Sequence, residues 1–230
     1  VMDMPAITAA GHRIGATVGW DLAHAAGNIP LSLHDWDVDF AAWCTYKYLN
    51  SGPGAISALF VHERHVGDRS LPRLEGWWST DPDTRFAMNP VSDPPASADA
   101  WALSNSPVLS MTPVIASLRL FDEVGMPALR ARSLRLNSYL RSLLELIAPA
   151  TGISIVTPAD PERHGTQLSV RVPGDVVAIT EALATDFGVV ADERPPDIIR
   201  MAPAPLYCTF HDCWRSADAL SRVLGGEGLA

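Results

Sequence analysis

The chain has 230 residues, of which 47% are hydrophobic and 19% are charged, and its 17 basic and 26 acidic side chains give a formal net charge of −9. A net negative charge disfavours nucleic acid and anionic membrane surfaces as partners. The sequence has no run of about 18 apolar residues, residues 1–5 lack the features of a signal peptide, and three cysteines without a C-x-x-C pair favour a reducing cytoplasm over a disulfide framework.

Helix and strand signals alternate in the first half of the chain. Residues 4–12, with a proline in the first turn, predict a short helix, and residues 16–20 and 38–44 are apolar runs of strand length. Residues 55–61 are apolar again, and this alternation predicts βα units with a mainly parallel sheet. Residues 79–100 are rich in Pro, Asp and Ser and predict a long surface loop.

The second half begins with strong helical patterning beyond Pro113. Leucines at spacings of three and four between residues 128 and 147 predict an amphipathic helix. The remaining predicted elements are strands at 152–156, 167–172 and 198–202 and helices at 175–187 and 211–224. We therefore expect two domains, residues 1–125 and a small α+β domain of residues 126–230.

Two polar side chains follow successive strand-like runs. Asp21 ends the run at 16–20, and Lys47 follows the run at 38–44 and precedes a glycine-rich turn. Ligands of open α/β sheets gather at the carboxyl ends of strands. A lysine and a carboxylate there suit pyridoxal phosphate, since the amine forms a Schiff base and the carboxylate keeps the pyridine nitrogen protonated. The structural alternatives are a helix cap for Asp21 and a plain surface lysine for Lys47.

Longer motifs resemble kynureninase. They are DLAHAAGN (21–28), LHDW (33–36), VDFA (38–41), YKYLN (46–50), FVHERH (60–65), GWW (76–78), TRF (84–86), SN (104–105) and RMAPAPLYCTFHD (200–212). The resemblance covers essentially the whole chain in order, but only the C-terminal half of a complete kynureninase. It implies the pyridoxal-phosphate-dependent transferase fold type I, with residues 1–125 as the C-terminal part of the cofactor-binding large domain and residues 126–230 as the small C-terminal domain.

The resemblance also implies an activity. Kynureninases are cytoplasmic homodimers that use pyridoxal 5'-phosphate to hydrolyse the Cβ–Cγ bond of L-kynurenine, or of its 3-hydroxy form. The products are anthranilate, or its hydroxy form, and L-alanine, on the route of tryptophan catabolism and NAD biosynthesis. No metal is implied, and the expected partners are a small amino acid substrate and a second subunit that shares the active site.

Residue roles follow from the matching motifs. Lys47 would hold the cofactor and act as the catalytic base, and Tyr46 would contact the cofactor phosphate and assist proton transfer. Asp21 would pair with the pyridine nitrogen, and His24 would lie beside the cofactor. Three further residues lie outside this group: Trp77 and Asn105, which would reach the cofactor from the neighbouring subunit, and Arg200, which would bind the substrate α-carboxylate.

Several alternatives remain open. His24 could pack against a helix, Trp77 could be a core or interface residue, and Arg200 could form a plain ion pair. His62 and His65 suggest a metal site, but no third ligand with suitable spacing follows, and this interpretation is rejected.

The missing N-terminal half opens a second set of alternatives. The chain would be a fragment, or one piece of a split enzyme with a companion N-terminal chain, and inactive alone. A cysteine-desulfurase-like lyase is disfavoured, because Tyr46 stands where those enzymes carry a histidine. A non-catalytic subunit is the remaining hypothesis.

Overall fold

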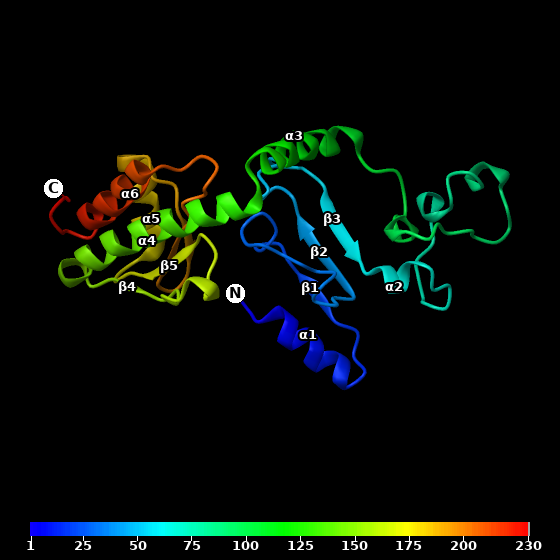
Figure 1. Cartoon of the computed structure of the whole chain (residues 1–230). Helices are drawn as coiled ribbons and strands as arrows, with labels where there is room; N and C mark the ends of the chain where they lie inside the picture. Colours follow the sequence, from blue (N-terminus) through cyan, green and yellow to red (C-terminus); the bar gives the residue numbers. More distant parts are fainter. Residues whose placement is uncertain (230) are drawn as a thin grey trace. The chain divides into compact units, whose positions relative to one another are not determined.

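The computed structural model describes residues 1–229 and divides into two compact units (Figure 1). The amino-terminal unit comprises residues 2–123, and the carboxy-terminal unit comprises the chain from residue 124 onward together with Val1. Each unit contains its own sheet. Among residues 1–229, no helix combines the length and the apolar character that crossing a bilayer requires.

Three strands form the sheet of the amino-terminal unit in the order β1-β2-β3. The elements, in chain order, are α1 (Met4–Arg13), β1 (Gly19–Asp21), β2 (Phe40–Cys44), β3 (Ser57–Val61) and α2 (Glu63–Val66). β1 and β2 are parallel, but β3 runs antiparallel to β2, so the sheet of this unit is mixed. The link of residues 45–56 contains no helix, and a parallel crossover usually requires one.

The core of the amino-terminal unit lies on one face of this sheet. Met4 of α1 packs there with the buried side chains of Leu22, Val38 and Ala41. Neighbouring residues along a strand point to opposite faces, so Phe40 projects from the other side, where it is 46% exposed. One face is therefore covered and the other is open.

Asp39 ties the starts of the two parallel strands to both helices. Its carboxylate accepts hydrogen bonds from Val18 N at 2.6 Å, His12 Nε2 at 2.8 Å, His65 Nε2 at 2.6 Å and Arg64 Nε at 3.1 Å. Burial alone would raise the pKa of Asp39, but the hydrogen bonds from Val18, Arg64 and the two histidines lower this pKa well below its usual range. An ionised, fully bonded Asp39 thus fixes the register of β1 against β2.

Replacing Asp39 with asparagine is expected to lower the free energy of unfolding at neutral pH, with a smaller loss in acid. The folded-state pKa is depressed, so the stabilisation from the ionised carboxylate is complete above the unfolded pKa of about 4 and is lost as the pH falls toward the folded pKa. Urea unfolding of both proteins between neutral pH and about pH 3 measures the difference. A difference that does not shrink in acid would contradict the ionised role of this carboxylate.

Residues 67–107, which we call the loop lobe, contain the predicted long loop. The only regular elements in it are three short 3-10 turns: η1 (Trp77–Ser79), η2 (Arg85–Ala87) and η3 (Ala98–Trp101). Helix α3 (Val108–Val124) follows and begins before its expected start at Pro113. Pro113 has no backbone N–H, so it cannot make the helical hydrogen bond to the carbonyl of Leu109. Leu109 is 88% exposed, so water can reach this part of the helix.

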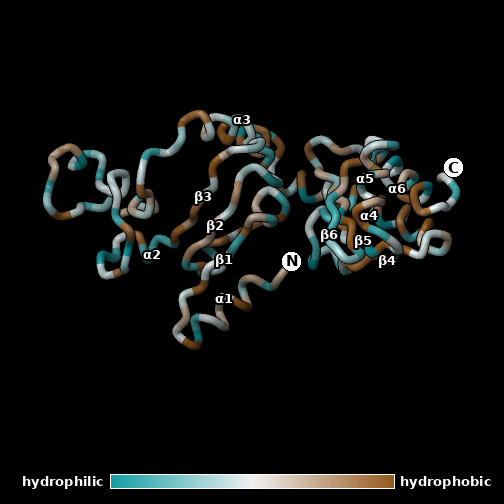
Figure 2. Tube along the Cα trace, turned by 180° about the vertical axis from the view of Figure 1, so that it is seen from behind, coloured by the Kyte–Doolittle hydropathy of each residue, from teal (hydrophilic) through white to brown (hydrophobic). Residues whose placement is uncertain are grey.

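The carboxy-terminal unit packs three helices on an antiparallel sheet of order β4-β5-β7-β6. Its elements are α4 (Met126–Thr151), β4 (Ser154–Ile155), η4 (Pro161–Arg163), β5 (Leu168–Arg171), α5 (Val176–Phe187), β6 (Asp192–Arg194), β7 (Ile198–Met201) and α6 (Phe210–Val223). Leu136, Leu140 and Leu144 of α4 are buried against Leu168 and Ile199, and hydrophobic stretches gather where α4 and β5 meet (Figure 2). The predicted helix of residues 128–147 is confirmed and is longer than expected.

Candidate functional site

Asp21 and Lys47 lie at the same edge of the amino-terminal sheet. β1 and β2 are parallel, with Asp21 opposite Ala42, so their carboxyl ends point the same way. Lys47 lies in the loop that follows β2, where Ser51 N donates to Thr45 O at 3.1 Å and closes a short loop around the lysine. The amine and the carboxylate are therefore carried by neighbouring strand ends.

The two side chains have different surroundings. Asp21 Oδ1 accepts a hydrogen bond from Ala23 N at 2.9 Å and closes a turn; no helix follows within residues 22–39, so the alternative of a helix cap is wrong. Asp21 also lines an open hollow of about 420 Å³ together with Phe40 and Cys44. Within residues 1–229, the amine of Lys47 has no hydrogen-bond or ion-pair partner. The hollow borders the Asp21 carboxylate, and the Lys47 amine can bind a ligand without breaking an existing ion pair.

Gly27 brings the turn after Asp21 against the lysine loop. It has a φ of +77°, and a Cβ built on it would lie 2.9 Å from the backbone of Tyr48 and from Leu49 N. Among the glycines of residues 1–229, no other combines a positive φ with so close an approach. The contact is a backbone one, so it sets the distance between the Asp21 turn and the Lys47 loop.

Replacing Gly27 with alanine is expected to destabilise the protein and to weaken cofactor binding, because the loop that carries Lys47 must move. Gly54→Ala is the matched control: Gly54 has a φ of +81° with nothing within 4 Å of the added carbon. Gly54→Ala should therefore lower the free energy of unfolding by backbone strain alone, about 1–2 kcal/mol. Thermal unfolding and pyridoxal phosphate titration measure both variants. Equal effects of the two substitutions would show that the Gly27 contact is unimportant.

The neighbouring aromatic side chains are partly exposed. Tyr46 is 49% exposed, and its hydrogen bond with the Cys44 thiol raises the pKa of the Tyr46 hydroxyl. The ring of His24 lies edge-on to Tyr48, with centroids 6.1 Å apart. Tyr46 and His24 thus belong to the two segments, around Lys47 and after Asp21, that Gly27 brings together.

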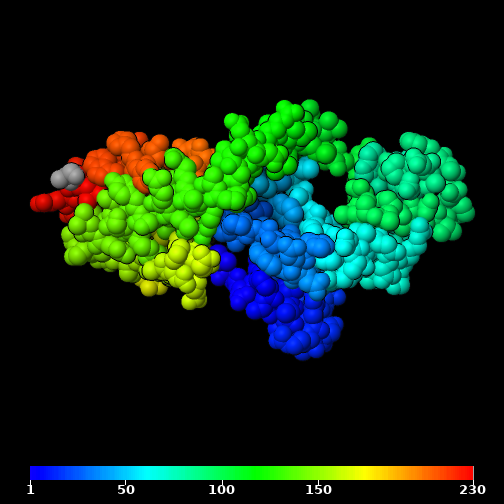
Figure 3. Space-filling view, viewed as in Figure 1, coloured from blue at the N-terminus to red at the C-terminus, as the bar shows by residue number. Residues whose placement is uncertain are grey.

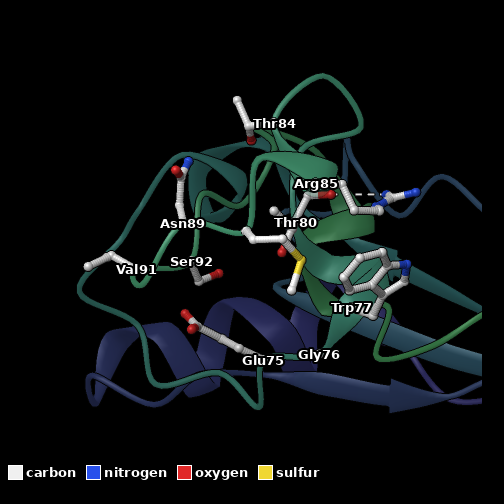
Figure 4. Close-up of a pocket in the computed structure, with 10 residues that line it drawn as sticks. Glu75, Gly76, Trp77, Thr80, Thr84, Arg85, Asn89, Val91 and Ser92 are labelled. Atoms are coloured by element: carbon white, nitrogen blue, oxygen red, sulfur yellow. Dashed lines mark hydrogen bonds between the residues drawn. The ribbon is translucent and has the colours of Figure 1, made fainter.

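Trp77 and Asn105 belong to two segments that meet in the loop lobe. Trp78 N donates to Leu103 O at 3.4 Å. A Cβ on Gly76 would lie 2.1 Å from the same oxygen, so only glycine permits this approach. Trp77 is 45% exposed and borders a hollow of about 310 Å³ (Figure 4).

Arg85, which sequence reasoning treated only as part of a motif, supports the turn that carries Trp77. Its guanidinium carbon lies 4.1 Å from the centroid of the Trp78 ring. Arg85 Nη2 also donates to Trp78 O at 3.3 Å and to Thr80 O at 3.0 Å. The hydrogen bond to Thr80 O is drawn in Figure 4. Sequence offered no signal for this role, since both acceptors are backbone carbonyls.

The loop lobe lies at the opposite end of the sheet from Asp21 and Lys47. Because β3 is antiparallel to β2, the end of β3 at Val61 pairs with Phe40 at the start of β2, and the chain enters the lobe from there through α2. Figure 1 shows the lobe beyond α2, and in Figure 3 it is the teal-green mass that adjoins the cyan part of the unit. The amino-terminal unit therefore carries two groups of candidate residues: one at the sheet edge with Asp21 and Lys47, and one in the loop lobe.

Arg200 lies on β7 of the carboxy-terminal unit. It projects from the face of the sheet away from the core, since Ile199 and Met201 on either side of it are buried. Its guanidinium pairs with Asp192 of β6, so the ion-pair alternative is realised, and Arg200 Nε is buried without a partner. Sequence reasoning did not identify Asp192, because β6 lacks an apolar pattern.

His62 and His65 have structural partners. His62 Nδ1 accepts a hydrogen bond from Arg64 N at 3.2 Å, and His65 bonds Asp39. In the part of the chain that the structure describes, no three His, Cys, Asp or Glu side chains are grouped to hold a metal ion.

Solved structures share the fold of this chain. A cysteine desulfurase from Escherichia coli matches 97% of this chain and 55% of its own length, with a TM-score of 0.72 and 19% sequence identity. Aminotransferases match as well. At these identities the comparison shows the fold alone. The chain therefore has the α/β fold of fold-type-I pyridoxal-phosphate enzymes, as predicted.

Sequence comparison finds similarity to one family. Residues 129–220 match the family described as the kynureninase C-terminal domain. A kynureninase from Salinispora tropica is 61% identical over 225 residues, which are 97% of this chain and 52% of that protein. A kynureninase from Flavobacterium johnsoniae is 49% identical over 229 residues, 99% of this chain and 54% of that protein. The predicted resemblance to kynureninase is confirmed, and the chain spans about half the length of these relatives.

A compositional signal in the sequence bears on the candidate amine. Of the 17 basic residues, Lys47 is the only lysine, and the other 17 − 1 = 16 are arginines. A guanidinium stays protonated and does not act as an amine nucleophile. Lys47 is therefore the only side chain here that could bind an aldehyde through an amine.

Proposed function

We propose that this chain is the portion of a kynureninase that supplies its lysine, its pyridine-binding carboxylate and its carboxylate-binding arginine. The full protein would hydrolyse L-kynurenine, or 3-hydroxykynurenine, to anthranilate, or 3-hydroxyanthranilate, and L-alanine. The observation that carries this proposal is the 61% identity to a kynureninase over 97% of the chain. The juxtaposed Asp21 and Lys47 support it, because they suit pyridoxal 5'-phosphate in chemistry and in placement.

Each side chain has a defined task in this reaction. Pyridoxal phosphate, when bound, supplies an electron sink for the bonds at the substrate α-carbon. The carboxylate of Asp21 holds the proton on the pyridine nitrogen, and the freed amine of Lys47 takes the proton from the α-carbon. The Tyr46 hydroxyl, next in sequence to this amine, contacts the phosphate and helps return protons. Arg200 binds the α-carboxylate through its planar guanidinium.

Water completes the reaction. It adds to the γ-carbonyl carbon, the Cβ–Cγ bond breaks, and the acyl half leaves as the aryl carboxylic acid. The remaining three-carbon unit takes up a proton at Cβ, regains the proton that Lys47 had taken from the α-carbon, and leaves as alanine. Atoms balance, because one substrate molecule and one water give one aryl acid and one amino acid.

We further propose a homodimer with a shared active site. The loop lobe lies at the end of the sheet away from Lys47, and two residues expected to contact the cofactor, Trp77 and Asn105, belong to it. A second copy can present its lobe to the Lys47 edge of the first, as a two-fold symmetric pair allows. In the same proposal, residues 1–125 are part of the cofactor-binding domain and residues 126–230 are the small domain. We also propose that the protein is cytoplasmic, because its three free thiols suit a reducing compartment.

The test is a fusion protein that joins this chain to the segment by which the Salinispora tropica relative is longer. With pyridoxal phosphate, the fusion is expected to release anthranilate from L-kynurenine, as measured by anthranilate fluorescence, and the chain alone is expected not to. A parallel assay with 3-hydroxykynurenine shows which of the two substrates is preferred. A fusion that binds the cofactor and turns over neither substrate would overturn the proposed activity.

A further inference from the structure

Asp192 is the ion-pair partner of Arg200. The two residues lie directly opposite each other on the antiparallel strands β6 and β7. Arg200 Nη2 donates to Asp192 Oδ2, and Arg194 Nη1 donates to the other oxygen of the same carboxylate. Asp192 is thus held between two guanidinium groups, with each of its oxygens accepting one hydrogen bond.

This arrangement leaves Arg200 oriented and still cationic. The charges of Arg194, Asp192 and Arg200 sum to +1, so the carboxylate does not cancel the attraction for an anion. One terminal nitrogen of Arg200 is used by Asp192, and its Nε is buried with no partner. An arginine side chain loses much conformational entropy when it is fixed in one rotamer. If Asp192 has already fixed the planar guanidinium, binding a carboxylate costs less of this entropy.

We propose that Asp192 is a positioning residue that fixes the guanidinium of Arg200 for the α-carboxylate of the amino acid substrate. This inference rests on the proposed function, because that function gives Arg200 its ligand. Asp192 acts through Arg200 and touches neither the substrate nor the cofactor. Its substitution should therefore change carboxylate binding and leave the chemistry at Lys47 unaltered.

The experiment compares two ligands that differ only in the carboxylate. L-alanine and L-alaninamide are titrated into the cofactor-loaded fusion protein, and binding is followed by the change in visible absorbance. Asp192→Ala is expected to weaken L-alanine binding about tenfold, as expected for loss of one charge-assisted hydrogen bond that holds the arginine. L-alaninamide binding should not change. Asp192→Asn keeps an oxygen acceptor and should stay close to the unmutated protein.

Asp197→Asn is the matched control. Asp197 pairs with Arg171 at 2.8 Å in the same unit, and its loss should leave both ligands unaffected. If Asp192 merely competed with substrate for Arg200, both Asp192 variants would bind L-alanine more tightly, which would overturn the inference. An unchanged affinity in Asp192→Ala, or an equal loss for both ligands, would also overturn it. A fusion protein with no cofactor absorbance at all would instead overturn the proposed function on which the inference rests.

Discussion

Replacing Lys47 with alanine is expected to remove the visible absorbance of the cofactor-loaded fusion protein and to lower kynurenine turnover by about 10⁴-fold or more. The reason is that this one amine both holds the cofactor and takes the α-proton. No other lysine in this chain can replace it, since Lys47 is the only one. Absorbance spectra and anthranilate release, measured on the same samples, give both quantities.

Lys47→Arg is the control for charge in this experiment. It keeps a cation in the same loop but cannot form the covalent link, so it should be as inactive as Lys47→Ala. Thermal unfolding checks that both variants fold. Visible absorbance and turnover retained in either variant would contradict the assignment of Lys47.

Mixing two inactive variants is expected to restore turnover if the active site is shared between subunits. Lys47→Ala loses the amine and Trp77→Ala loses the lobe contact, but a mixed dimer contains one site with both residues intact. Random reassortment of equal amounts gives about half mixed dimers, each with one working site of two, and hence about a quarter of full activity. The measurement is anthranilate release after the two proteins are unfolded together and refolded.

The matched control mixes Trp77→Ala with Asn105→Ala. Both substitutions lie in the loop lobe, so every site in every mixed dimer has one damaged lobe, and no recovery is expected. Equal recovery in the two mixtures would show that restoration does not depend on a lobe from the neighbouring chain. No recovery in the first mixture would contradict the shared site.

Much of the fold could be predicted because its buried elements have clear apolar periodicity. The strand at 38–44 and the helices at 128–147 and 175–187 were all predicted, and the structure confirms them. β6 was missed, because an edge strand of sequence Asp-Glu-Arg has neither apolar alternation nor β-branched residues. The reversed direction of β3 was also missed, since strand patterns do not encode direction.

The site was predictable to a lesser degree. Asp21 and Lys47 could be placed near strand ends, because Asp21 directly follows an apolar run and Lys47 comes three residues after the end of another. The supporting contacts could not be predicted, because they join residues far apart in the chain: Asp39 with His12, and Gly27 with the backbone of Tyr48. Such contacts depend on tertiary packing, which local patterns do not specify.

The most direct test of the central claim is to find where the cofactor is attached. The fusion protein is loaded with pyridoxal phosphate, reduced with borohydride to fix the link, digested, and mapped by mass spectrometry. The account predicts that the reduced cofactor is found on the peptide that contains Lys47. Cofactor attached to another amine, or to none, would contradict it.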